Sequence, residues 1–128
     1  MRRRRKSEPA PDPGDVLDRI RAGEDLRVHD VVLAFAAAHE RLYSRRAFGD
    51  LREAREAEAR ALVICRRDFA SALDMARAVV RLDRFWFLRA GQSRWPAQDG
   101  APPTFERLTA PRLIDAFKSG EVARELAG

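Results

Sequence analysis

The sequence predicts an all-α fold, a single small helical domain of five or six helices behind a disordered N-terminal arm. Apolar residues recur at helical spacing along most of the chain, and glycines and prolines separate the periodic segments. The length of 128 residues suits one domain, and a hydrophobic share of 45% is enough to form a core. We therefore divide the chain into an arm at residues 1–14 and a helical domain at residues 15–128.

The arm carries five consecutive cations and then three prolines. The cations repel one another, and proline lacks the backbone donor that a helix requires, so we expect no fixed structure. The five positive charges equal the net charge of +5 of the whole chain, which leaves the remainder neutral. The cations are Arg2, Arg3, Arg4, Arg5 and Lys6, and the prolines are Pro9, Pro11 and Pro13.

Two helices are expected in the first third of the domain. The first begins at Asp15 as its N-cap and ends near Gly23, which suits a helix C-terminus. The second begins at Asp30 and ends at Arg45-Arg46, where cations favour the helix dipole. Apolar stripes define the buried faces: Val16, Leu17 and Ile20 in the first helix, and Val31, Phe35, Ala38 and Leu42 in the second.

A third helix is predicted from Asp50 to Arg67. Asp50 followed by Glu53 is a pattern typical of helix starts, and strong helix formers follow. Glu56 and Arg60 have the order of a favourable i,i+4 ion pair. The second half of this helix is apolar all round, which indicates that it enters the core.

The apolar second half of the predicted third helix contains Leu62-Val63-Ile64-Cys65. A β-strand at residues 61–65 is the alternative structure for this stretch. A fourth helix follows, capped by Asp68 or Ser71. Its expected faces are apolar: Phe69, Leu73, Ala76 and Val80 on one, with Met75, Val79 and Leu82 beside it.

The region from Arg84 to Gln98 admits two structures. In the favoured one, the fourth helix continues and stops at Gly91; in the other, residues 85–90 and 93–97 form a short β-hairpin. Pro96 would end the second strand early, which favours the helix. The aromatic residues here are expected to be core, or to stack bases beside cations. They are Phe85, Trp86, Phe87 and Trp95.

The C-terminal third begins with a proline-rich loop at residues 96–103. Thr109, with Pro111 in the first turn, predicts the next helix. Ser119 then interrupts it and caps a last short helix.

Arginines supply the candidate contacts for phosphate. Guanidinium groups match phosphate geometry, and cations near a polyanion gain free energy by releasing counterions. We expect the arm to act as a sequence-blind tether and the cations near the ends of the second and third helices to form an orienting patch, although a solvated surface is the competing explanation. The candidate nucleic-acid-binding residues are Arg2, Arg3, Arg4, Arg5, Lys6, Arg45, Arg46, Arg52, Arg66, Arg67, Arg89 and Arg94.

No pattern in the sequence indicates catalysis, a metal site or a cofactor. His29 and His39 are ten residues apart, and no further ligands stand at metal-binding spacing. His39 is expected to be a hydrogen-bonded histidine at the edge of an apolar face. Cys65, the only cysteine, lies in an apolar run and suggests a buried, inert thiol. Neither a glycine-rich phosphate loop nor a nucleophile elbow is present.

These observations lead us to expect a non-enzymatic, nucleic-acid-associated protein that contacts the phosphate backbone. Charge is segregated along the chain, with an excess of five acidic groups in residues 7–40 and of six basic groups in residues 41–94. The alternative is therefore a protein-interaction or assembly subunit of a regulatory complex or viral particle, with an acidic protein or identical copies as partner. No apolar run approaches the ~18 residues of a membrane span, so we expect a cytoplasmic location, at the nucleoid in bacteria and in the nucleus for a eukaryotic or viral host.

Overall fold

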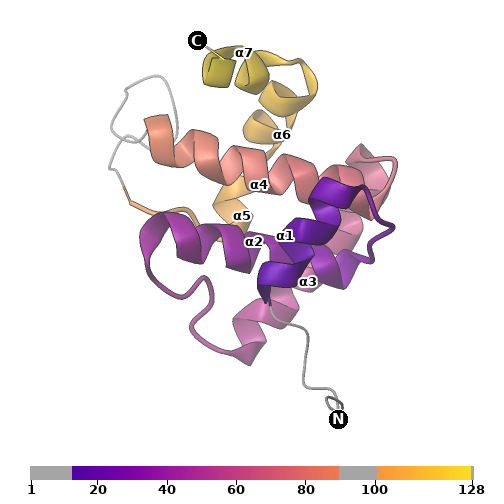
Figure 1. Cartoon of the computed structure of the whole chain (residues 1–128), viewed down its shortest axis with the longest axis vertical. Coiled ribbons are helices and arrows are strands. Elements are labelled where there is room, and N and C mark those ends of the chain that lie inside the picture. The colour runs from indigo at the N-terminus through magenta and orange to yellow at the C-terminus, as the bar shows by residue number, and fades with distance from the viewer. Residues whose placement is uncertain (1–12, 90–100, 128) are drawn as a thin grey trace.

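The computed structural model describes residues 13–89 and 101–127, and these residues form helices and loops with no strand. The fold class is therefore all-α, as predicted. Seven helices are present in the described ranges, one more than the expected maximum (Figure 1). They are α1 (Pro13–Ala22), α2 (Val28–Tyr43), α3 (Leu51–Asp68), α4 (Ala72–Arg89), α5 (Phe105–Leu108), α6 (Pro111–Lys118) and α7 (Glu121–Ala127).

Helix α1 begins at Pro13, two residues before the expected N-cap Asp15. Proline is well suited to the first turn of a helix, because its missing N–H would have no intrahelical partner there. The predicted apolar stripe of α1 is buried, and Gly23 ends the helix with a φ of +73°, as expected. Residues 1–12 of the predicted arm lie outside the described residues.

Helix α2 begins at Val28, so Asp30 is its third residue and not its cap. From that position the Asp30 carboxylate accepts a hydrogen bond of 2.9 Å from the backbone N–H of Arg27. The same side chain lies 3.5 Å from the guanidinium of Arg19, which connects α2 to α1. The predicted face of α2 is buried at Val31, Phe35 and Ala38, with Phe35 completely buried, whereas Leu42 at its end is half-buried.

Helix α3 is capped by Asp50, whose carboxylate accepts a 2.9 Å hydrogen bond from the backbone N–H of Glu53. The helix is continuous to Asp68, so the strand alternative at 61–65 is wrong. The prediction that the apolar stretch enters the core is only half right. Ile64 and Cys65 are buried, whereas Leu62 is 39% exposed and Val63 is 59% exposed.

Helix α4 is preceded by Ser71, whose hydroxyl accepts a hydrogen bond from the backbone N–H of Asp74. The helix extends through Phe85 and Trp86 to Arg89, so residues 85–89 are not a strand. The rest of the hairpin region, up to residue 97, lies outside the described residues. The most deeply buried face of α4 is the predicted neighbouring stripe of Met75, Val79 and Leu82, together with Ala76 from the first predicted face.

The C-terminal third contains a helix that periodicity did not predict. Helix α5 is a single turn capped by the Thr104 hydroxyl, too short for an apolar repeat to be visible. Thr109 does not open the next helix; it follows α5, and α6 begins at Pro111. Ser119 separates α6 from α7, as expected.

Helix α2 lies at the centre of the fold and packs against α1, α3 and α4. Helix α4 separates α2 from α6 and α7, which Figure 1 shows on the far side of α4 from α2. Within the described residues, no helix is both long enough and apolar enough to cross a membrane.

Candidate functional site

The structure does not bring the predicted patch of arginines together. Arg45 and Arg46 are exposed in the connection before α3, and Arg52 lies in the first turn of α3. Arg66 and Arg67 lie in its last turn. With a rise of 1.5 Å per residue, Arg52 and Arg66 are separated by about 21 Å along the helix axis. The long third helix therefore divides the patch into two groups at opposite ends.

Several of the predicted contact residues are occupied within the molecule. Arg52 pairs with Glu56 at 3.1 Å, and Arg67 pairs with Asp68 at 2.9 Å. The Arg89 Nη2 donates a 2.6 Å hydrogen bond to the Glu125 carbonyl and so attaches α4 to α7. The Arg89 side chain thus makes a structural contact within the protein and is not a free cation. Residues 2–6 of the arm and Arg94 lie outside the described residues.

A different set of arginines shares one face of the molecule. Arg77, Arg81 and Arg84 follow one another at i, i+4 and i+7 on α4, and all three are exposed. This spacing places them along one side of the helix over about 10 Å. The Arg77 guanidinium lies 3.7 Å from where a Cβ on Gly23 would stand, so this row borders the end of α1.

A cavity of about 320 Å³ adjoins this row, between α1, α2 and α4. Three cations from three helices border it, namely Arg21 from α1, Arg41 from α2 and Arg84 from α4. We call this cavity the arginine groove. Its remaining lining is apolar and consists of Leu17, Ile20, Ala38, Leu42 and Val80.

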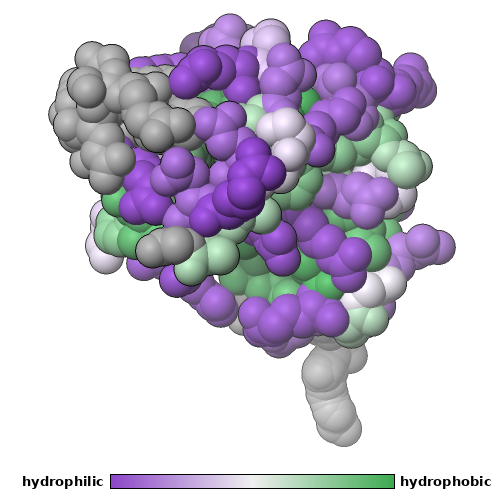
Figure 2. All heavy atoms as spheres, turned by 90° about the horizontal axis from the view of Figure 1, so that it is seen from above, coloured by the Kyte–Doolittle hydropathy of each residue, from purple (hydrophilic) through white to green (hydrophobic). Residues whose placement is uncertain are grey.

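The cations around the groove are largely without internal counter-charges. Arg21 pairs with Asp18 on its own helix. Among the described residues, no hydrogen bond or ion pair engages Arg41, Arg77, Arg81 or Arg84. Figure 2 shows one face of the molecule, on which hydrophilic side chains cover most of the visible described surface and hydrophobic patches appear between them. The groove therefore combines an apolar floor with two arginines, Arg41 and Arg84, that no carboxylate of the described residues neutralises.

Sequence reasoning missed this site because it joins residues from three helices. The row on α4 alone was visible in the sequence, since Arg77, Arg81 and Arg84 repeat on the helix face opposite the buried stripe. The contribution of Arg41 depends on the packing of α2 against α4. No local pattern encodes that packing.

A buried polar pair lies between α2 and α4, two of the three helices that line the groove. The His39 Nδ1 is 3.1 Å from one oxygen of Asp83 and 3.3 Å from the other, and both side chains are almost completely buried. Burial raises the pKa of Asp83, and the hydrogen bond with His39 opposes that increase. His39 is hydrogen-bonded, as predicted, but in the core. The pair connects α2 to α4 next to the positions of Arg41 and Arg84.

Aromatic rings surround this pair. The His39 ring contacts Phe35 with a centroid distance of 4.9 Å and Tyr43 with a centroid distance of 4.6 Å. The Tyr43 hydroxyl is buried and has no hydrogen-bond partner in the described part of the chain, and burial together with the nearby Asp83 charge raises its pKa. Tyr43 in turn contacts the edge of Phe87 at 5.3 Å. These contacts hold His39 in a closed environment.

The other candidate for chemistry, Cys65, is buried, and burial raises the pKa of its thiol. A raised pKa lowers the thiolate fraction at neutral pH and thus the reactivity of the group. Within the described ranges, no three His, Cys, Asp or Glu side chains form a group that could hold a metal ion.

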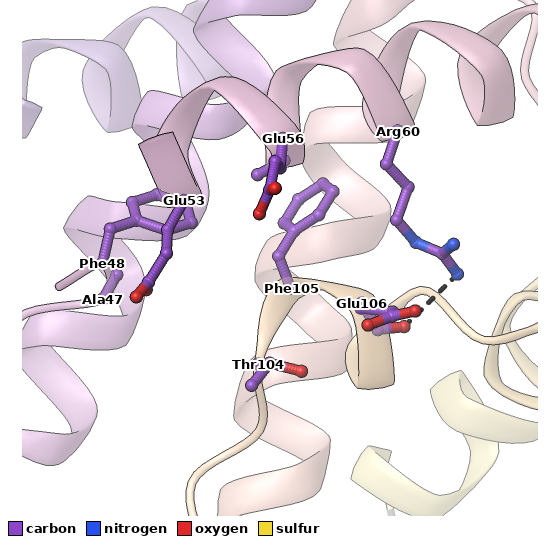
Figure 3. A pocket seen from close by; sticks show the side chains of 9 residues that line it. Ala47, Phe48, Glu53, Glu56, Arg60, Thr104, Phe105 and Glu106 are labelled. Atoms are coloured by element: carbon purple, nitrogen blue, oxygen red, sulfur yellow. Dashed lines mark hydrogen bonds between the residues drawn. The ribbon is translucent and has the colours of Figure 1, made fainter. Parts of the chain in front are cut away.

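A second cavity, of about 480 Å³, lies beneath α3 (Figure 3). Its polar lining is engaged in structural contacts: Glu53 accepts a hydrogen bond from the Gly49 N–H, and Glu56 pairs with Arg52. Glu56 therefore pairs with Arg52 in place of its predicted partner, Arg60. Arg60 donates to the Thr109 hydroxyl at 2.9 Å and to the carbonyls of Glu106 and Thr109 at 3.3 Å each. This cavity therefore lies where α3 packs against α5, and the Arg60 side chain holds the two helices together.

No protein-family model matches the chain, and neither a curated protein nor a solved structure shows significant similarity to it.

Proposed function

We propose that this protein binds nucleic acid, with the arginine groove and the adjacent row on α4 contacting the phosphate backbone. The observation that carries the proposal is a set of exposed arginines that have no partner within residues 13–89 and 101–127, namely Arg41, Arg77, Arg81 and Arg84. The arm residues Arg2–Lys6 add a sequence-independent tether in this proposal. The burial of His39 and Cys65 supports a binding role over a catalytic one.

Unpaired guanidinium groups suit this role for an energetic reason. A cation that already has a carboxylate partner must lose that partner before it contacts phosphate, whereas a solvated cation only releases water and counterions. Guanidinium groups also present several donors in a plane that matches phosphate oxygens. Among the residues that the structure describes, no hydrogen bond or ion pair has to be broken before the row on α4 contacts phosphate.

The test is the salt dependence of binding to a fluorescently labelled oligonucleotide. Each phosphate contact contributes about 0.9 to the slope of log K against log salt for duplex DNA and about 0.7 for a single strand. We expect replacement of Arg77, Arg81 and Arg84 by alanine to reduce the slope by about two to three.

The matched control replaces Arg46, Arg55 and Arg66, which are exposed at other places on the surface. The two variants have the same net charge. If the affinity for the oligonucleotide falls equally in both variants, binding is due to net charge alone and the groove has no role. If the unaltered protein does not bind the oligonucleotide, the proposed function is wrong.

A second candidate function is that of an assembly subunit, and the exposed apolar residues of α3 favour it. Leu62 and Val63 expose 39% and 59% of their surface side by side on one helix. Adjacent exposed apolar side chains are typical of surfaces that pack against a partner. Self-association predicts a molar mass above 14.5 kDa in light scattering, and that mass should fall in a Leu62→Ser, Val63→Ser variant.

A further inference from the structure

The floor of the arginine groove has no role in binding a duplex backbone. Phosphates and sugars are polar, and duplex bases are paired and stacked away from a protein that contacts only the backbone. Yet the surface between Arg21, Arg41 and Arg84 is formed by aliphatic side chains, of which Leu42 and Val80 are half-buried. A ligand that covers this floor needs an apolar part as well as negative charge.

An exposed aromatic ring stands next to the groove. Phe87 lies one turn after Arg84 on α4 and is 43% exposed. Its ring is held by an edge contact with Tyr43, the residue after Leu42 in the groove floor, at a centroid distance of 5.3 Å and an interplanar angle of 80°. The ring is thus fixed in place and yet open to solvent, which is the arrangement of a stacking platform.

We infer that the groove and Phe87 together bind single-stranded nucleic acid, with phosphates on the arginines and one or two bases on the apolar floor and the Phe87 ring. The inference rests on the proposed function and specifies its ligand. Unpaired bases can turn outward and stack on aromatic rings or guanidinium planes, and such stacking tolerates any sequence. A single strand therefore satisfies both the charge and the apolar surface, whereas a duplex satisfies the charge alone.

The experiment compares a short labelled oligo(dT) with a duplex of the same length, using the full chain. We expect tighter binding of the single strand, and an approximately tenfold loss of that affinity in Phe87→Ala, because a base stacked on an aromatic ring contributes on this scale. Duplex affinity should change less than about twofold, because the backbone contacts remain. Leu62→Ala is the matched control, because Leu62 is 39% exposed on α3, a helix that does not line the groove.

A second variant keeps the test decisive if Phe87→Ala does not fold. Val80→Thr makes the half-buried groove floor more polar without changing its charge, and it should weaken single-strand binding selectively. Its control, Val63→Thr, makes the same change at an exposed position of α3. Equal affinity for both nucleic acids, or binding of only an acidic helical peptide, would overturn the inference. Duplex binding alone would leave the proposed function intact, and no nucleic-acid binding at all would remove both.

Discussion

The Nδ1 atom of His39 lies 3.1 Å from a carboxylate oxygen of Asp83, and this buried contact links α2 to α4 across 44 residues of sequence. Arg41 is two residues from His39 on α2, and Arg84 follows Asp83 on α4. The pair therefore fixes the relative position of two helices that each contribute an arginine to the groove. The stability of the core and the geometry of the candidate site depend on the same contact.

Asp83 should make stability depend on pH in a predictable direction. Burial raises its pKa, so the folded state holds this proton at a pH where the unfolded chain has released it. The resulting stabilisation is complete below the ordinary Asp pKa of about 3.9 and disappears as pH rises through the folded value. The free energy of unfolding of the unaltered protein, minus that of Asp83→Asn, should therefore decrease with rising pH above about pH 4. Denaturant titrations of both proteins measure it, and a difference that does not vary with pH contradicts the argument.

Arg60 should hold α5 and the start of α6 against α3. Arg60→Ala removes its hydrogen bonds to the fully buried Thr109 and to the carbonyl of Glu106. We expect a loss of about 1–3 kcal/mol, because the contacts involve a charged donor. Amide hydrogen exchange should accelerate most in residues 105–118. Arg55→Ala, an exposed change on the same helix, should leave both measurements nearly unaltered.

The N-cap of α3 provides a separate stability test. Asp50→Ala removes the hydrogen bond to the Glu53 N–H and should cost about 1 kcal/mol, or a few degrees in Tm. Asp50→Asn keeps a side-chain oxygen that can accept this hydrogen bond, so thermal unfolding followed by circular dichroism should separate the two variants. A similar loss in both would mean that the charge, and not the cap, stabilises the helix.

The arm should contribute to affinity in a manner independent of the groove. Deletion of residues 2–6 removes five cations, and the slope of log K against log salt should become shallower for unrelated oligonucleotides alike. The preference for single strands should remain, since the proposed stacking surface is unaltered. An unchanged slope would show that the arm does not meet phosphate.

The features that sequence reasoning predicted correctly are local ones. The buried face of α2, the end of α1 at Gly23 and the cap at Asp50 each depend on residues within one or two helical turns. The predicted first residues of the helices were less accurate, because Asp30 stabilises α2 from its third position and α1 begins at a proline. Both residues are compatible with more than one position in a first turn.

The features that sequence reasoning missed depend on tertiary packing. The spacing of four residues predicts Glu56 as the partner of Arg60, but the hydroxyl acceptor of Arg60 is Thr109, 49 residues further along the chain. The apolar neighbours of Leu62 and Val63 predict that both residues are in the core, yet their side of α3 faces solvent. The arginine groove was missed for the same reason, since α1, α2 and α4 contribute one bordering cation each.

The central position of α2 has a consequence for the way this chain folds. Its packing partners α1 and α3 are its immediate neighbours in sequence, so much of the core closes through short loops with a small entropic cost. Proteins with mainly local contacts fold within microseconds to milliseconds. We expect the first three helices to associate early, with the arrival of α4 as the slower step that completes the hydrophobic interior.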